Sequence, residues 1–174
     1  MLHNSKDLLV YNARSMEVVK EKNIGVECRA VAPCGNHIWV GDQKGNLIVL
    51  DRDLTEVKRI DGAHSQKVNK IISDGKHVLS GDAYRYIKVH DGSTCEQVAS
   101  WGDSGFSIKD LDIAGPRVVS TTTNHAYCVF DMEGLKFVRE HKMAHGTRDL
   151  DCAAVWNEHI WSAGKDCAIR QWNF

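Results

Sequence analysis

The sequence predicts an all-β protein built from small sheets that repeat along the chain. Short apolar runs that end in Asp or Asn return every 39 to 42 residues, and their last residues are Asn12, Asp51, Asp91, Asp131 and Asn173. The runs are rich in Val, Ile, Trp and Tyr, residues that favour strands. Because no segment shows a sustained period of 3.6 residues, helices are not expected.

A complete repeat contains four extended runs, which we name a, b, c and d in chain order. In the repeat at 63–102 they are VNKIISDG, HVLSGD, IKVHD and QVASWG. Turn sequences such as Asp-Gly, Asn-His and Lys-Gly-Asn separate the runs. Four short strands in every 40 or so residues are typical of a β-propeller, whose blades are small sheets stacked around an axis. We therefore predict a partial ring of about four four-stranded blades.

The runs also give the expected boundaries of the blades. The segment 1–24 supplies only c and d, and 143–174 supplies only a, b and c, whereas the complete blades are 25–62, 63–102 and 103–142. Such an arc leaves the apolar flanks of its end blades in water, at roughly 1.5–3 kcal/mol for each large side chain. We expect a missing segment or a second chain to complete the propeller; dimerisation into an eight-bladed body is the alternative.

The last segment carries residues that resemble a known repeat pattern. His145 follows Ala144 ahead of run a, Ser162 lies in run b, Asp166 in the b–c turn and Trp172 in run c. This arrangement resembles the WD-repeat family, in which such a His, Ser, Asp and Trp form a hydrogen-bonded tetrad. The resemblance implies a WD-repeat β-propeller held by a structural tetrad of His145, Ser162, Asp166 and Trp172.

The other segments keep fewer of the tetrad residues, although all of them fall in the same register. The segment 63–102 keeps His64 and Ser80, and 103–142 keeps Ser120. The residues that stand where the remaining polar members would be are Tyr84 and His90 in the former, Asn124 and Phe130 in the latter, and Val40, Lys44 and Leu50 in 25–62. The resemblance covers essentially the whole chain and is strongest at its end.

A serine hydrolase is the alternative interpretation of Ser162, His145 and Asp166. A catalytic serine stands exposed on a strained turn such as Gly-x-Ser-x-Gly, whereas Ser162 lies in the middle of a strand-like run. We therefore expect no catalytic residues and no enzyme activity. Histidines recur at the start of run b, each in a different blade and too far apart to share a metal ion; they are His37, His77 and His159. Neither a metal nor a cofactor is expected.

The candidate binding surface is one rim of the arc. In propellers the d–a connections and the b–c turns emerge on the same rim, which the WD-repeat family uses as its main docking surface. Aromatic and Arg side chains are common in interface hot spots. The candidate rim residues are Lys67, Tyr84, Arg85, Trp101, Phe106, His125 and Arg148. For Trp101 the alternative is packing between blades, where we also expect Trp39, Trp156 and Trp161.

Composition limits the partners and the location. With a formal net charge of −1 and no long apolar stretch, we expect neither a nucleic-acid nor a membrane partner. The first residues lack the pattern of a signal peptide, so a cytoplasmic or else nuclear location is expected. The six cysteines include no CxxC pair, and Cys28, Cys128 and Cys152 lie within apolar runs. We expect them to be buried free thiols rather than disulfides or zinc ligands.

Together these features predict a non-enzymatic scaffold that binds proteins or peptides within a larger propeller or a multi-subunit assembly. Two alternatives stay open. The short a–b hairpins resemble those of propellers attached to signalling enzymes, which implies a non-catalytic arm of a kinase, phosphatase or exchange factor. The ending VWNEHIWSAGKDCAIRQWN resembles the close of actin-interacting propellers, which implies an actin-regulating fragment.

Overall fold

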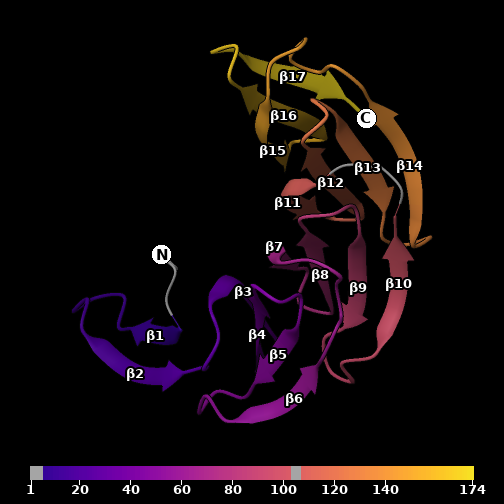
Figure 1. Cartoon of the computed structure of the whole chain (residues 1–174). Helices are drawn as coiled ribbons and strands as arrows, with labels where there is room; N and C mark the ends of the chain where they lie inside the picture. The colour runs from indigo at the N-terminus through magenta and orange to yellow at the C-terminus, as the bar shows by residue number, and fades with distance from the viewer. Residues whose placement is uncertain (1–5, 103–106) are drawn as a thin grey trace.

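The computed structural model describes residues 6–102 and 107–174, and it confirms the predicted all-β partial ring. Antiparallel sheets follow one another along an open arc, with the described ends of the chain at the two ends of that arc (Figure 1). In this described part, no helix is long and apolar enough to cross a membrane.

Each sheet is made of consecutive strands joined as hairpins. The first sheet pairs β1 (Asp7–Tyr11) with β2 (Val18–Asn23), and the last contains β15 (Leu150–Trp156), β16 (His159–Gly164) and β17 (Ile169–Asn173). The strands of the three four-stranded sheets are β3 (Cys28–Cys34), β4 (His37–Asp42), β5 (Leu47–Leu50) and β6 (Glu56–Ile60); β7 (Val68–Ser73), β8 (His77–Asp82), β9 (Ile87–Asp91) and β10 (Gln97–Trp101); and β11 (Ile108–Ala114), β12 (Arg117–Thr122), β13 (Tyr127–Asp131) and β14 (Lys136–His141).

The sheets pack face to face as blades, with strand a of each on the inside of the arc and strand d on the outside (Figure 1). Successive inner strands β3, β7, β11 and β15 contact one another. Each inner strand has a register irregularity near its start, such as the one between Val68 and Lys70. The extra residue brings Val68 and Ile71, three positions apart, to the same face of the sheet.

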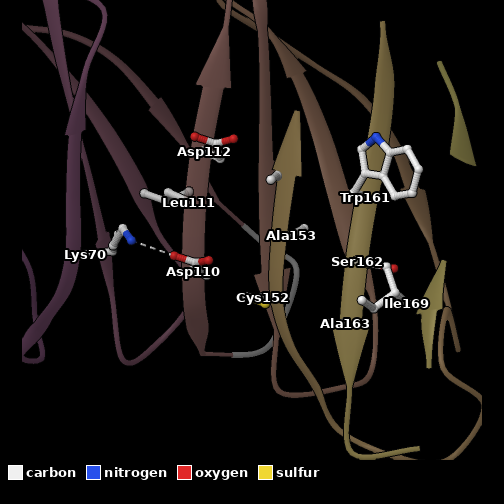
Figure 2. Close-up of a pocket in the computed structure, with 11 residues that line it drawn as sticks. Lys70, Asp110, Leu111, Asp112, Cys152, Ala153, Trp161, Ser162, Ala163 and Ile169 are labelled. Carbon is white, nitrogen blue, oxygen red and sulfur yellow. Dashed lines mark ion pairs between the residues drawn. The ribbon is translucent and has the colours of Figure 1, made fainter. Parts of the chain in front are cut away.

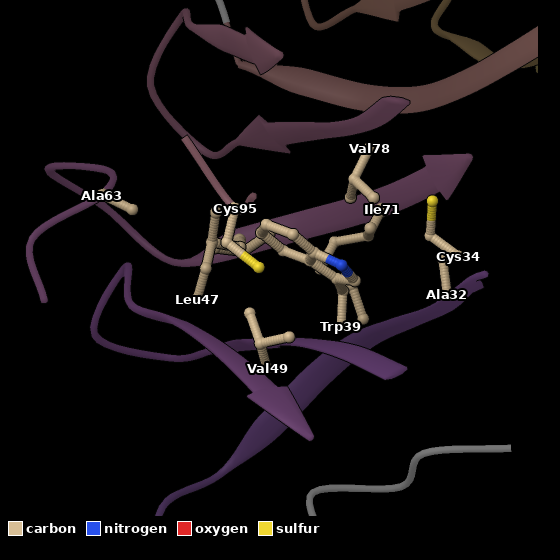
Figure 3. Packing of buried hydrophobic residues seen from close by; sticks show 11 residues of the cluster. Ala32, Cys34, Trp39, Leu47, Val49, Ala63, Ile71, Val78 and Cys95 are labelled. Carbon is tan, nitrogen blue, oxygen red and sulfur yellow. The ribbon is translucent and has the colours of Figure 1, made fainter. Parts of the chain in front are cut away.

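The hydrophobic core lies between the blades rather than within them. One cluster joins Trp39, Leu47 and Val49 of the second blade to Val68 and Ile71 of the third (Figure 3). Similar clusters join the other neighbouring blades. Burying each large apolar side chain contributes roughly 1.5–3 kcal/mol, so each blade depends on its neighbours for its stability.

The three tryptophans expected in this core differ in their surroundings. Trp39 is completely buried, as expected, but Trp161 is only half-buried and Trp156 is 63% exposed. The expectation for Trp156 was wrong because local alternation shows which face of a strand is apolar, but not whether another sheet covers that face. Trp156 and Trp161 lie on the outer face of the last blade, where the described residues provide no further sheet.

The cysteines are all free, and they divide into two groups. Cys28, Cys34, Cys95 and Cys128 are buried, whereas Cys152 and Cys167 are exposed, which corrects the expectation that Cys152 is buried. Burial raises the pKa of Cys28 to about 11, with a further contribution from the Asp42 charge. It also raises the pKa of Cys128 to about 12. Protonated, buried thiols of this kind are poor nucleophiles.

A thiol reagent is therefore expected to modify two of the six cysteines rapidly in the native protein and all six after denaturation. The measurement is the number of thiols that react with a colorimetric disulfide reagent at pH 8. Replacing Cys152 and Cys167 with serine should abolish the fast phase. Rapid reaction of four or more native thiols would contradict the packing described above.

Candidate functional site

One rim of the arc is tied together by the main chain. Among the described residues, six backbone hydrogen bonds link a b–c turn to the connection that enters the same blade or the next one; the donor and acceptor pairs are Gln43 N to Glu27 O, His64 N to Gly45 O, Ala83 N to Lys67 O, Thr123 N to Ser107 O, Ala144 N to His125 O and Lys165 N to Asp149 O. These bonds tie the loops of the second and third blades into one stretch of the rim, and those of the fourth and last blades into another. The structure thus places both kinds of loop on one rim.

The β8–β9 turn presents the most prominent side chains of this rim. The buried carboxylate of Asp82 accepts hydrogen bonds from the backbone N–H groups of Tyr84 (3.0 Å), Arg85 (2.8 Å) and Tyr86 (2.9 Å). The residues Tyr84 and Tyr86 are 45% and 38% exposed, and the Arg85 guanidinium lies 4.4 Å from the centre of the Tyr84 ring. A fixed backbone therefore carries a preorganised aromatic and cationic cluster.

The other rim candidates surround this cluster or lie farther along the arc. Lys67 is half-buried just before β7, and Arg148 is exposed in the connection before β15. His125 Nδ1 lies 3.5 Å from the carboxylate of Asp149, which also pairs with Lys165 at 2.6 Å. The rim is thus apolar and cationic at the third blade and a mixed ion network at the last one. Phe106 lies outside the described residues.

Trp101 does not belong to this rim, which corrects the rim prediction. It is the last residue of β10 and is only 6% exposed. Its ring stacks on Phe130 of the next blade with centroids 4.7 Å apart, and its indole N–H donates to the Leu135 carbonyl at 2.9 Å. The following glycine made Trp101 resemble a turn residue, but its large apolar ring is buried between the blades, where both ring and N–H find partners.

The four tetrad residues of the last blade come together. His145 Nδ1 donates to Asp166 Oδ1 at 2.6 Å, since a carboxylate only accepts. His145 Nε2 then accepts from Ser162 Oγ at 2.8 Å, and Ser162 Oγ accepts from Trp172 Nε1 at 2.8 Å. Burial raises the pKa of Asp166, but hydrogen bonds from His145 and Ala168 outweigh this and hold the pKa below its usual range. The chain of bonds joins the connection before β15, strands β16 and β17, and the turn between these two strands.

The third blade has a carboxylate in this network that the sequence pattern missed. His64 Nε2 is 2.8 Å from Ser80 Oγ, and His64 Nδ1 lies 3.3 Å from Asp82 Oδ2. The expectation that Tyr84 replaces the acid was wrong, because Asp82 supplies it from two residues after the serine rather than four. The signal was present in the Gly-Asp ending shared by HIWVGD and HVLSGD, where Asp42 organises the preceding blade's turn in the same way.

The histidines at the start of strand b each bond to a nearby oxygen. His37 Nδ1 lies 2.9 Å from the Gly92 carbonyl, His77 Nδ1 3.0 Å from the Asp74 carboxylate and His159 Nδ1 2.6 Å from the Asn157 carbonyl. Across residues 6–102 and 107–174, no group of three or more His, Cys, Asp or Glu side chains is arranged to hold a metal ion. These contacts give each histidine a local structural partner.

His90 gives the core a pH dependence that can be measured. Burial, with the positive charges of His64, Lys88 and Lys58, lowers the pKa of His90 to about 4. The unfolded chain takes up this proton near pH 6.5, so the contribution of His90 to stability is present above that pH. It is lost as the pH falls toward 4, at up to about 1.4 kcal/mol per pH unit. Urea unfolding at pH 7.0, 5.5 and 4.5 measures this loss.

The control for this measurement is His90→Leu, which copies Leu50 at the same position of the preceding blade. This variant should lose stability less steeply over the same pH range. Equal slopes for the variant and the wild type would show that His90 is not the titrating group.

Comparison with known proteins gives structural matches only. No protein-family model and no curated protein matches the sequence. The computationally designed protein Ika8 is similar with a TM-score of 0.85 and 19% identity, over 98% of this chain and 54% of that one. The designed protein Ika4 is similar with a TM-score of 0.77 and 21% identity, over 86% of this chain and 92% of that one.

Two natural proteins show the same likeness. A chain of the mitotic checkpoint complex matches with a TM-score of 0.82 and 18% identity, over 97% of this chain and 55% of that one. Raptor from Chaetomium thermophilum matches with a TM-score of 0.84 and 14% identity, over 98% of this chain and 18% of that one. The chain spans about half the length of Ika8 and of the checkpoint protein. At these identities the matches show the fold: this chain is an arc of propeller-like blades.

Proposed function

We propose that this chain is a non-catalytic scaffold of the WD-repeat type, which binds proteins or peptides through its rim as part of a larger propeller or multi-subunit assembly. The observation that carries the proposal is the Asp82-held turn. It presents Tyr84, Arg85 and Tyr86 in a fixed geometry on a surface that hydrogen bonds make rigid. Tyr and Arg are enriched in interface hot spots, and preorganised side chains lose little entropy on binding.

Two further observations support this proposal. Ser162 is 2% exposed and already bonded to His145 and Trp172, which favours a structural over a hydrolytic role. The checkpoint-complex match is a chain of a multi-protein assembly. We also propose a location in the cytoplasm or the nucleus, where a reducing environment keeps cysteines as free thiols.

Affinity purification with quantitative mass spectrometry tests the rim. The tagged wild type is compared with a Tyr84→Ala, Arg85→Ala double variant, and with a Lys76→Ala, Glu133→Ala variant whose exposed residues lie in turns at the opposite ends of the strands. We expect at least one stably bound protein to fall about tenfold or more with the rim variant only. Equal recovery of every bound protein by all three forms would contradict the rim as a binding surface.

A further inference from the structure

The outer face of the last blade, which we call the open flank, leaves several apolar side chains exposed or half-buried. It consists of Cys152, Ala154, Trp156, Trp161, Ala163 and Ile169, from β15, β16 and β17. Ile169 is 75% exposed, and the rings of Trp156 and Trp161 lie 6.3 Å apart. Part of this face lines a pocket that continues inward to the Lys70–Asp110 ion pair (Figure 2).

Strand register shows that the open flank is equivalent to a face of the second blade that is covered. In both blades the same pairing pattern joins strand a to strand b and strand b to strand c. The equivalent residues, second blade first, are Ala30 and Cys152, Ala32 and Ala154, Trp39 and Trp161, Gly41 and Ala163, and Leu47 and Ile169. The open flank therefore repeats much of that covered face, with tryptophan at the same place. It differs where Trp156 stands for Cys34 and Ala163 for Gly41.

The third blade covers that face in the second blade. Trp39 and Leu47 are fully buried there against Val68, Ile71 and Val78 (Figure 3). The approach is close, because a Cβ added to Gly41 would lie 2.6 Å from the Val68 Cβ. Equivalent side chains are buried in the second blade and exposed to solvent in the last one. This difference indicates that a neighbouring blade is missing beside the last blade.

Every inner strand that covers such a face carries apolar side chains three positions apart, after the irregularity at its start. The pairs are Val68 and Ile71, Ile108 and Leu111, and Leu150 and Ala153. A blade with aliphatic residues at these two positions is the surface that fits the open flank. Among the strands described, none pairs with the outer edge of β17. A blade bound to the open flank would therefore lie beside an unpaired strand edge.

We infer that the open flank binds a β-blade of a partner protein, whose inner strand places two aliphatic side chains against Trp161 and Ile169. This inference rests on the proposed function, since it specifies the surface by which the scaffold joins a larger propeller. Burial of the flank would remove the exposed apolar side chains from water, which is the main force between the blades already present.

A second copy of this chain does not fit the flank as well as a foreign blade. The inner strand that a second copy could offer is β3 of its second blade. In each copy, β1 of the first blade already packs against that second blade, with Leu8 beside Ile48 and Leu50. In the last blade β17 occupies the equivalent place, where Trp172 packs near Tyr127 of β13. Two copies joined end to end would therefore bring β1 and β17 to one position.

The experiment appends a blade copied from this chain and reshapes the open flank to match the face that this blade covers. A copy of residues 52–102, the segment that covers the equivalent face, is appended after Asn173, with its copy of Cys95 changed to alanine. Cys167→Gly, Ala163→Gly and Trp156→Ala are introduced, because the equivalent residues of the second blade are Gly45, Gly41 and Cys34. A Cβ at Gly45 would lie 2.2 Å from the His64 carbonyl oxygen, one at Gly41 would lie 2.6 Å from the Val68 Cβ, and Cys34 packs beside Gly92. Replacing Cys167 also leaves Cys152 as the sole exposed thiol of the original chain.

We expect Cys152 to be labelled at least tenfold more slowly in the extended protein than in the same triple variant without the appended segment. An extended control with Asp at the appended copies of Val68 and Ile71 should return to the faster rate. An unchanged Cys152 rate, or an appended segment that stays protease-sensitive, overturns the inference, because the same segment folds on the equivalent face of the second blade.

Protection of Cys152 in the unextended chain that rises with concentration, together with the mass of a dimer, would overturn the choice of a foreign partner. None of these outcomes tests the rim. Binding that depends on Tyr84 and Arg85 would still support the proposed function if any of them were observed. If Cys152 is protected but no bound protein depends on Tyr84 and Arg85, the flank inference would stand and the proposed binding function of the rim would fail.

Discussion

Replacing Trp101 with alanine is expected to lower the free energy of unfolding by about 3–5 kcal/mol. The substitution removes the stacking on Phe130, leaves a cavity between the third and fourth blades, and deprives the Leu135 carbonyl of its hydrogen bond. Urea or guanidinium unfolding, followed by far-ultraviolet circular dichroism, measures the change. The expected loss is a large part of the 5–15 kcal/mol typical of a folded domain.

Trp156→Ala is the matched control for this prediction, because it removes the same side chain from a position that is 63% exposed. Its effect should stay within about 0.5 kcal/mol. A Trp101→Ala variant that is no less stable than Trp156→Ala would place Trp101 at the surface and restore it as a rim candidate.

Replacing Asp82 with alanine is the second large effect, with an expected loss of about 3–5 kcal/mol. The carboxylate is fully buried, faces His64, and accepts three backbone hydrogen bonds from the β8–β9 turn. Its removal leaves those donors unsatisfied and frees the turn that carries Tyr84 and Arg85. Chemical denaturation measures the loss, and rim binding should weaken with it.

Asp53→Ala is the control for Asp82, because it removes an exposed carboxylate that pairs with Lys20 on the surface. Exposed ion pairs contribute roughly 0–1 kcal/mol, so this variant should unfold almost like the wild type. Similar losses in the two variants would mean that Asp82 does not organise the turn.

The sequence predicted the features that depend on repetition and failed for those that depend on a single neighbour. Fold class and strand positions followed from runs that return every 39 to 42 residues, and the His145, Ser162, Asp166 and Trp172 network followed from one well-kept repeat. These features need only local pattern and register.

The errors have separate physical causes. Asp82 was missed because a buried carboxylate can reach the histidine from two different places in the b–c turn. Trp101 was misplaced because a residue beside glycine was read as part of a loop, although its ring fits between blades. Exposure of Trp156 depends on whether another sheet lies beyond it, which no local pattern in the chain encodes.

The central claim is that the small sheets pack side by side around the arc, with consecutive inner strands in contact. Lys70 and Asp110 on β7 and β11 lie 2.8 Å apart, and Lys109 and Asp151 on β11 and β15 lie 3.1 Å apart. Zero-length carbodiimide cross-linking with mass spectrometry should therefore recover amide links Lys70–Asp110 and Lys109–Asp151, the first of them abolished by Asp110→Asn. Lys–Asp links that instead join blades that are not neighbours, with these two absent, would contradict the arrangement.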